Sequence, residues 1–424
     1  MGGYLTVGAV AATVTFLFTF LMRWVAPRVG AMAMPGPRSV HTTPVPYLGG
    51  AAMFVGFVVA FAVASRIPQF HEMFADNSEP IGLLLAAAVM FVVFVIDDFR
   101  DVSPPAKIAG QVLSGSVLSL FGVTMLYFRV PFASYEYVVL SADLAPLVTV
   151  ITVVVLANAV NLIDGLDGLA AGVVLIAAAA IFLYADRLFK AGLLEGSNMA
   201  PLVAALTVGI CAGFLPHNFS PARIIMGDAG AMLLGLFLAT MTITIGGRTT
   251  DPFSGQTYFY FAPLVIPLVI LGVPIVDTAF SFFRRVVKRQ HFADADREHL
   301  HHRLMRMGHG PRRAVIILWL WTALLSTVVL LPTFTDRGNT LVVPAVISLG
   351  LLLYIYFHPG VRTARQQAAL AEAESAAGVA ASDADASPGT DASNGATDGS
   401  TGTSTGTSTG VVELDRHRRR RASG

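Results

Sequence analysis

Eleven long apolar stretches restrict what this chain can fold into. A transmembrane helix needs about 20 mostly apolar residues to cross the hydrocarbon core of a bilayer. Such stretches lie at residues 3–22, 47–64, 80–96, 106–127, 143–160, 169–185, 199–216, 229–246, 258–281, 314–332 and 339–357. Only 13% of the residues are charged, against about 25% in soluble domains. The sequence therefore predicts an all-α polytopic integral membrane protein with about eleven transmembrane helices.

The distribution of basic residues predicts the orientation of these helices. Lysine and arginine are enriched in cytoplasmic loops. If the N-terminus lies outside, most of the 28 lysine and arginine residues fall on the inner side of the membrane. We therefore expect a multi-pass protein of the cell membrane with its N-terminus outside and its C-terminus in the cytoplasm.

Charge and cysteine content argue against two other classes of protein. The formal net charge of +1 gives no reason to expect a nucleic-acid partner. Cys211 is the only cysteine, so no intrachain disulfide can form and nothing points to a secreted disulfide scaffold.

We expect the chain to divide into a membrane-embedded domain, residues 1–357, which would carry any catalytic residues, and a low-complexity tail, residues 358–424. The tail contains "ASDADASPGTDASNGATDGSTGTSTGTSTG" and ends in "RHRRRR". This composition cannot bury enough apolar surface to fold, so we expect a disordered cytoplasmic tail. Its basic end suits either an electrostatic tether to the anionic inner leaflet or a solvated, dispensable segment.

Polar residues gather in five connections that share one side of the predicted topology. These connections are residues 35–50, 97–107, 161–168, 216–228 and 297–310. Ionisable groups at membrane depth are costly and usually functional. The pattern therefore predicts an active site on the cytoplasmic face.

Two acids end one of the apolar stretches. Asp97 and Asp98 are adjacent, so their carboxylates repel and favour a cation or a shared proton. They also stand at a helix C-terminus, where the helix dipole disfavours negative charge. A charged helix end meeting water is the simpler explanation, but the dipole favours a functional role.

A second acidic group lies in "NLIDGLDGL". Asp164 and Asp167 are three residues apart and would share a face if this segment were helical. Asn161 adds a neutral oxygen. Such oxygens suit Mg²⁺, which binds few protein ligands together with substrate phosphates. The alternative is a polar turn, for which Asp-Gly pairs are typical.

Asp228 begins a later apolar stretch in "IIMGDAGAMLLG". It is either a helix N-terminal cap or a further contributor to the metal site.

The segment "HLHHRL" contributes a cationic group, His299, His301, His302 and Arg303. A zinc site is one interpretation, but there is no nearby cysteine and the arginine would repel a dication. A patch that binds a diphosphate fits better.

Four motifs together resemble the polyprenyl-phosphate N-acetylhexosamine-1-phosphate transferases, which are integral-membrane enzymes. The motifs are "DDFRDVSPPAK", "NAVNLIDGLDGLAAG", "PHNFSPARIIMGDAGAM" and "HLHHRL", and the resemblance extends over residues 1–357. It implies Mg²⁺-dependent transfer of a sugar-1-phosphate from a UDP-sugar to a polyprenyl phosphate, with release of UMP. Mn²⁺ is a candidate substitute for the metal. Ala231 departs from the pattern, since a serine is usual there.

The resemblance also implies roles for individual residues. Asn161 and Asp228 match the Mg²⁺ ligands. Asp97, Asp98 and Asp164 match the catalytic acids, with Asp97 deprotonating the acceptor phosphate. The nucleotide or diphosphate would be bound by Asp167, Asn218, His299, His301, His302 and Arg303. Arg38, His41 and Lys107 are candidate contacts to the lipid phosphate or substrate.

Within this family the chain looks most similar to the actinobacterial decaprenyl-phosphate GlcNAc-1-phosphate transferases, which begin arabinogalactan linker synthesis. The expected partners are UDP-GlcNAc, a polyprenyl phosphate, membrane lipids and, as dimers occur in the family, a second copy of the chain. UDP-GalNAc or UDP-MurNAc-pentapeptide are alternative donors. A CDP-alcohol phosphatidyltransferase and a membrane transporter are the rival functions, although no internal repeat of the transporter kind is evident. The resemblance leaves open whether transfer is direct or passes through an aspartyl phosphate.

Overall fold

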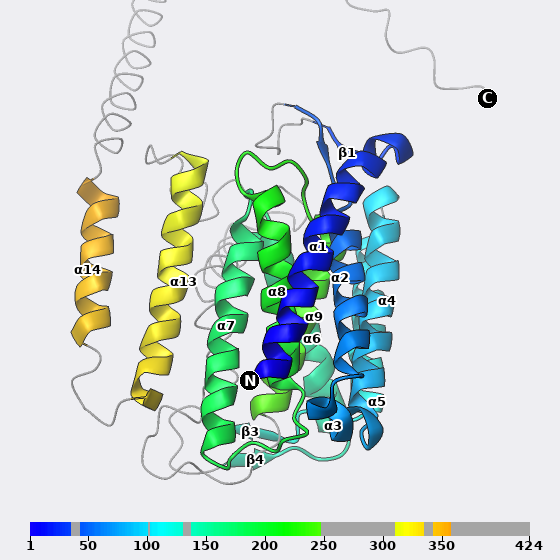
Figure 1. The fold of residues 1–424 in the computed structure, drawn as a ribbon, viewed down its shortest axis with the longest axis vertical. Coiled ribbons are helices and arrows are strands. Elements are labelled where there is room, and N and C mark those ends of the chain that lie inside the picture. The colour runs from blue at the N-terminus through cyan, green and yellow to red at the C-terminus, as the bar shows by residue number, and fades with distance from the viewer. Residues whose placement is uncertain (35–42, 101, 130–136, 247–309, 335–341, 358–424) are drawn as a thin grey trace, which may run out of the picture. The chain divides into compact units, whose positions relative to one another are not determined.

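The computed structural model describes residues 1–34, 43–100, 102–129, 137–246, 310–334 and 342–357. These residues form a helical bundle, drawn in Figure 1. Its longer helices are α1 (Gly2–Val29), α2 (Gly49–Ala64), α4 (Glu79–Phe99), α5 (Pro104–Leu120), α6 (Leu144–Ile163), α7 (Leu169–Lys190), α8 (Ala200–Asn218), α9 (Gly227–Gly246), α13 (Pro311–Phe334) and α14 (Val342–Phe357).

Short elements fill some of the connections between these helices. A 3-10 turn (Pro68–Phe70) and α3 (His71–Ala75) follow α2. There are also two antiparallel pairs of short strands. In the first, β1 (Met32–Ala33) pairs with β2 (Val45–Pro46), and in the second, β3 (Tyr127–Arg129) pairs with β4 (Tyr137–Val139).

The helices confirm an all-α polytopic membrane architecture in its main feature. Within the described residues, seven helices are long and apolar enough to cross a membrane, or eight if α2 and the bent segment after it count as one span. The expected number of eleven is not reached by this criterion, and the predicted stretch 258–281 lies outside the described residues. The tail, residues 358–424, lies outside them as well.

The stretch predicted at 106–127 forms a shorter helix than expected. Helix α5 ends at Leu120, and Gly122 follows with a backbone φ of 97°. Glycine adopts this left-handed conformation without a steric penalty, which lets the chain turn into β3.

Helix α9 lies at the centre of the bundle. In the 18-residue apolar stretch of α9, 94% is buried inside the bundle, compared with 22% in the corresponding stretch of α1. It packs against α2, α4, α6 and α8. A residue at the first turn of α9 is therefore surrounded by the ends of several other helices.

The chain runs up and down through the bundle, so functional connections collect at one end. Helices α4, α6 and α8 end where α5, α7 and α9 begin, at the upper end in Figure 1. The N-terminus lies at the opposite end, together with α3, β3 and β4. Residues far apart in the sequence can therefore meet at the upper end.

Candidate active site

The first acid of the α4 pair is tied to the beginning of α5. Its side chain, Asp97, is 4% exposed, and one carboxylate oxygen lies 2.5 Å from the Lys107 ammonium. The other oxygen accepts a hydrogen bond from the backbone N–H of Val102 at 3.0 Å. Buried carboxylates are stable only when they are paired and hydrogen-bonded in this way. Asp97 therefore fixes the turn between the two helices.

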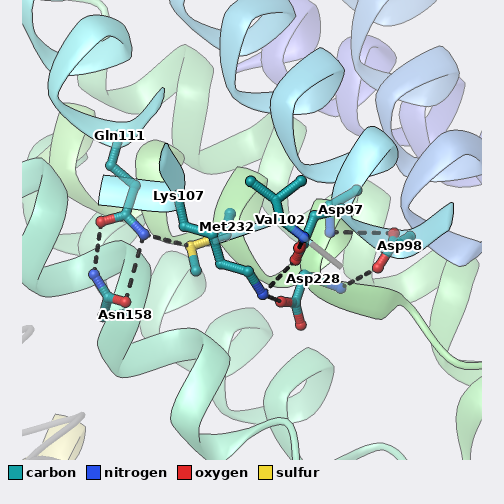
Figure 2. A network of polar contacts seen from close by, with 9 residues as sticks. Asp97, Asp98, Val102, Lys107, Gln111, Asn158, Asp228 and Met232 are labelled. Carbon is teal, nitrogen blue, oxygen red and sulfur yellow. Dashed lines mark hydrogen bonds and ion pairs between the residues drawn. The ribbon is translucent and has the colours of Figure 1, made fainter. Parts of the chain in front are cut away.

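Lys107 connects this turn to α9. Its ammonium also lies 3.2 Å from a carboxylate oxygen of Asp228, so one cation bridges two acids on different helices (Figure 2). The side chains of Lys107 and Asp228 are 31% and 33% exposed. Both groups thus remain reachable from outside the bundle.

The second acid of the pair, Asp98, caps α9. Its carboxylate accepts the backbone N–H groups of Asp228, at 2.9 Å, and Ala229, at 3.4 Å. These N–H groups have no partner within the helix, and the helix dipole makes this end positive. The N–H groups at the beginning of α9 therefore offset part of the unfavourable placement of this charge at the end of α4.

Glycine at position 227 makes this approach possible. Gly227 has a backbone φ of 71°, and a Cβ placed there would come within 2.7 Å of the Asp98 carboxylate. Any other residue would be strained by the backbone and would also collide with the capping acid.

The segment after α6 is a turn and not a helix. Asp164 follows the last residue of α6, and Gly168, with a φ of 77°, precedes the first residue of α7. Asp164 and Asp167 therefore do not share a helix face. The backbone here is therefore the polar turn that was the alternative to a helix. The Asp164 carboxyl nevertheless interacts electrostatically with Asp98 and Asp228.

Asp164 is electrostatically coupled to the other acids. Burial raises the pKa of its carboxyl to about 7. The carboxylates of Asp228, Asp167 and Asp98 add to this increase, because each disfavours a further negative charge nearby. The role of Asp164 in the same site as Asp98 and Asp228 stays a prediction.

Asp167 and Asn218 join two loops. An Asp167 carboxylate oxygen accepts the Ala222 N–H at 2.9 Å. The Asn218 side chain is buried, accepts the Gly168 N–H at 2.9 Å and donates to the Ile224 carbonyl at 3.0 Å. With these partners Asn218 holds the two loops together, and its contact with the nucleotide stays a prediction.

Two further segments pack on the loop before α9. The Pro46 carbonyl accepts the Ile225 N–H at 2.9 Å, and the Gly50 N–H donates to the Met226 carbonyl at 2.8 Å. Arg312, in the first turn of α13, donates from Nε to the Ser220 carbonyl at 2.7 Å. The described parts of four predicted polar connections, 35–50, 97–107, 161–168 and 216–228, therefore converge at this end of the bundle, while 297–309 lie outside the described residues.

Six of the candidate residues lie outside the described residues, and their roles stay predictions. They are Arg38, His41, His299, His301, His302 and Arg303.

The described donor set is compatible with Mg²⁺ bound in company with substrate. Among the residues that the structure describes, no group of three or more histidines, cysteines or acids is arranged as a metal site. Asn161, in the last turn of α6, and Asp228 offer one amide oxygen and one carboxylate. Magnesium commonly uses one or two protein oxygens and completes its shell with water and phosphates. Their assignment as ligands stays a prediction.

One pair of polar residues near the site had no predicted role. Gln111 of α5 and Asn158 of α6 form a hydrogen-bonded amide pair at 2.7 Å. The available signal was weak: Asn158 begins the motif "NAVNLIDGLDGLAAG", but nothing in the sequence links it to Gln111, 47 residues away.

Comparison with known proteins identifies the family. The model of the glycosyl transferase family 4 matches residues 80–246, from the second residue of α4 to the end of α9. A decaprenyl-phosphate N-acetylglucosaminephosphotransferase of Mycobacterium tuberculosis is 37% identical over 328 residues, covering 76% of this chain and 80% of the relative. The chain belongs to glycosyl transferase family 4. The resemblance inferred from the four motifs is thereby confirmed.

Other members of glycosyl transferase family 4 show similar coverage. The enzyme of the same name from Mycobacterium leprae is 34% identical over 342 residues, which is 79% of this chain and 85% of the relative. A probable undecaprenyl-phosphate N-acetylglucosaminyl 1-phosphate transferase of Bacillus subtilis is 33% identical over 312 residues, which is 73% and 80% of the two chains.

Proposed function

We propose that this glycosyl transferase family 4 protein transfers GlcNAc-1-phosphate from UDP-GlcNAc to a polyprenyl phosphate, with decaprenyl phosphate as the expected acceptor. UMP is released, and polyprenyl-diphosphate-GlcNAc begins a cell-wall or surface glycan such as an arabinogalactan linker. Relatives named for this reaction match three-quarters of the chain. The observation that carries the proposal is a cluster of acids near Lys107 at one end of the helical bundle. This acidic cluster consists of Asp97, Asp98, Asp164 and Asp228.

The charge of the cluster explains why a metal is expected. Both substrates are phosphate anions, and Asp97, Asp98, Asp164 and Asp228 would repel them. Lys107 alone does not balance these acids. Asn161 and Asp228 would hold a Mg²⁺ ion, which when bound neutralises the diphosphate and stabilises the leaving UMP.

Lys107 is placed to bind the acceptor. An anionic phosphate would compete with Asp97 and Asp228 for its ammonium, which is partly exposed. Lysine binds phosphate as a mobile point charge on a flexible stem. We expect the lipid phosphate to be held by Lys107 at the membrane surface.

Asp97 can act on the acceptor only after this exchange. Its carboxylate is occupied by Lys107 and the Val102 N–H. Movement of the ammonium to the phosphate would leave one oxygen available to accept a proton. The demand for a base is small, since a phosphate monoester has its second pKa near 6 and is mostly dianionic at neutral pH.

In the transfer step the β-phosphate of the donor moves to the lipid with the sugar, and the α-phosphate leaves in UMP. An oxygen of the acceptor phosphate attacks the β-phosphorus of UDP-GlcNAc and forms a new P–O bond. The bond from the β-phosphorus to the bridging oxygen breaks, and UMP leaves with the electron pair. In the two-step alternative an aspartate first takes the sugar phosphate, and incubation with labelled donor without acceptor would then label the protein.

A cytoplasmic site follows from the substrates. UDP-sugars are cytosolic, whereas the polyprenyl chain is anchored in the bilayer, so the two meet at the inner surface. The N-terminus lies at the end of the bundle opposite the acidic cluster. If the acidic cluster faces the cytoplasm, the N-terminus therefore lies on the outer side of the membrane.

The test is the lipid product. Purified protein with decaprenyl phosphate and Mg²⁺ is offered UDP-GlcNAc, UDP-GalNAc or UDP-MurNAc-pentapeptide, and the lipids are analysed by mass spectrometry. We expect decaprenyl-diphosphate-GlcNAc from the first donor. A product from only one of the other donors would replace the sugar assignment. Substrate uptake into proteoliposomes without any lipid product would favour a transporter.

A further inference from the structure

A partly buried polar contact joins three helices directly beneath the acidic cluster. The Asn158 amide of α6 donates to the Gln111 side-chain oxygen of α5 at 2.7 Å. Gln111 Nε2 lies 3.4 Å from Asn158 Oδ1 and 3.4 Å from the sulfur of Met232 in α9. Figure 2 shows this contact beside the Lys107 bridge. Gln111 and Met232 are each 1% exposed, whereas Asn158 is only partly buried, and its amide also donates to the Val154 carbonyl of its own helix at 2.8 Å.

Each member of this contact lies one helical turn from a residue of the site. Gln111 follows Lys107 by four residues in α5, and Met232 follows Asp228 by four residues in α9. Asn158 precedes Asn161 by three residues in α6. Residues three or four apart on a helix lie above one another on the same face. The contact therefore repeats, one turn deeper, the arrangement of Lys107, Asn161 and Asp228.

Stability alone does not account for two amides at this position. A buried amide gains little net free energy from its hydrogen bond, about 1 kcal/mol, and apolar residues of the same shape can replace both partners nearly without loss. A hydrogen-bonded amide pair differs from an apolar contact because a hydrogen bond requires a particular relative orientation of its two partners. One buried asparagine can fix the register of packed helices that apolar side chains would allow to slide.

We infer that the Gln111–Asn158 pair, completed by Met232, is a positioning device that fixes the register of α5, α6 and α9. It holds Lys107, Asn161 and Asp228 at the separation that metal binding and transfer require. The inference rests on the proposed function for its activity readout, but its metal readout is independent of turnover.

The decisive variant removes both amides together. Gln111→Met with Asn158→Leu keeps the volume similar and leaves neither amide unpaired. We expect a melting temperature near that of the wild type. Binding of Mn²⁺, followed by electron paramagnetic resonance without substrates, should weaken by at least about tenfold, the loss typical when the support of metal ligands is removed. The kcat for UMP release should fall by a similar factor, with KM for UDP-GlcNAc little changed.

Ser114 provides the matched control on the same helix. It is fully buried, lies three residues beyond Gln111, and donates a 2.8 Å hydrogen bond to the Ala86 carbonyl of α4. Ser114→Ala should lower the melting temperature without changing Mn²⁺ affinity or kcat. If the double variant does not fold, Gln111→Asn withdraws the amide by one methylene and serves the same comparison.

Three results separate the possible failures. Wild-type Mn²⁺ affinity and kcat in the folded double variant would reduce the pair to a packing contact. A wild type that binds Mn²⁺ but releases no UMP would contradict the proposed function, while the comparison of Mn²⁺ affinities would still test the positioning role. A wild type that binds no Mn²⁺ would overturn the metal assignment and this inference with it.

Discussion

The Asp98 carboxylate accepts the backbone N–H of Asp228 at a distance of 2.9 Å, across 130 residues of sequence. This bond places the end of α4 on the first turn of α9. It explains why an acid stands at a helix end where its own helix dipole disfavours it. It also holds the backbone of Asp228 while Lys107 holds its side chain.

Substitution of Asp98 should separate its capping role from its charge. Asp98→Ala removes a helix cap and should lower the free energy of unfolding by about 1–2 kcal/mol. Asp98→Asn keeps an oxygen that can accept one N–H, so it should recover most of the stability but not the UMP release. Thermal unfolding in detergent and the activity assay measure the two effects. Full recovery of both by asparagine would mean that Asp98 acts only as a cap.

Substitution of Gly227 should be far more damaging than that of a comparable glycine. Gly227→Ala combines a left-handed backbone, φ 71°, with a collision against Asp98. Gly30 has a φ of 75°, but a Cβ added there would meet nothing within 4 Å. Gly30→Ala should therefore cost only the backbone strain, about 1–2 kcal/mol. Activity should be lost in Gly227→Ala and kept in Gly30→Ala; equal activities would contradict the account of this loop.

Removal of the Lys107 ammonium should disable the site. Lys107→Met leaves Asp97 buried without its cation, at a cost below the roughly 3–5 kcal/mol of fully buried pairs because the lysine is 31% exposed. UMP release should fall by at least about a hundredfold, since a preorganised charge contributes that much to catalysis. Lys190→Met is the control, because Lys190 pairs with Asp186 on an exposed helix face. A similar loss in both variants would remove Lys107 from the site.

The stability of the metal-free protein should depend on pH through Asp164. Its folded-state pKa is raised to about 7, whereas an unfolded aspartate titrates near 3.9. Between about pH 4 and 7 the folded state therefore holds more protons, and stability falls as the pH rises through this window. Above pH 7 the charged carboxylate remains unfavourable.

The variant Asp164→Asn tests this dependence. In a chelator, it should be more stable than the wild type at pH 8, and the difference should close towards pH 5. Added Mg²⁺ should narrow the difference at pH 8. Asp143→Asn, at the opposite end of α6 and exposed, should show no such pattern. A difference for Asp164→Asn that is the same at both pH values would contradict the coupling.

The grouping of the site could be predicted because polar clusters are rare in an apolar chain. Residues 97–107, 161–168 and 216–228 were expected at one face, and their contacts confirm that they meet. Topology alone places them there, since the helices alternate in direction. The family followed from the same motifs.

The pairing of individual atoms could not be predicted in the same way. The bond from Asp98 to the start of α9 depends on how two distant helices pack, and on the left-handed conformation of Gly227. Gln111 and Asn158 stand 47 residues apart, on two different helices. No local pattern links such residues, because the link exists only after the three helices have packed.

The fate of the β-phosphate of the donor tests the central claim most directly. UDP-GlcNAc labelled at this phosphate would be incubated with the purified protein, decaprenyl phosphate and Mg²⁺. We predict that the label enters the lipid, that unlabelled UMP is released in equal amount, and that a chelator abolishes both. Label that stays in the nucleotide as UDP would mean that the sugar moves without its phosphate, and would contradict the account.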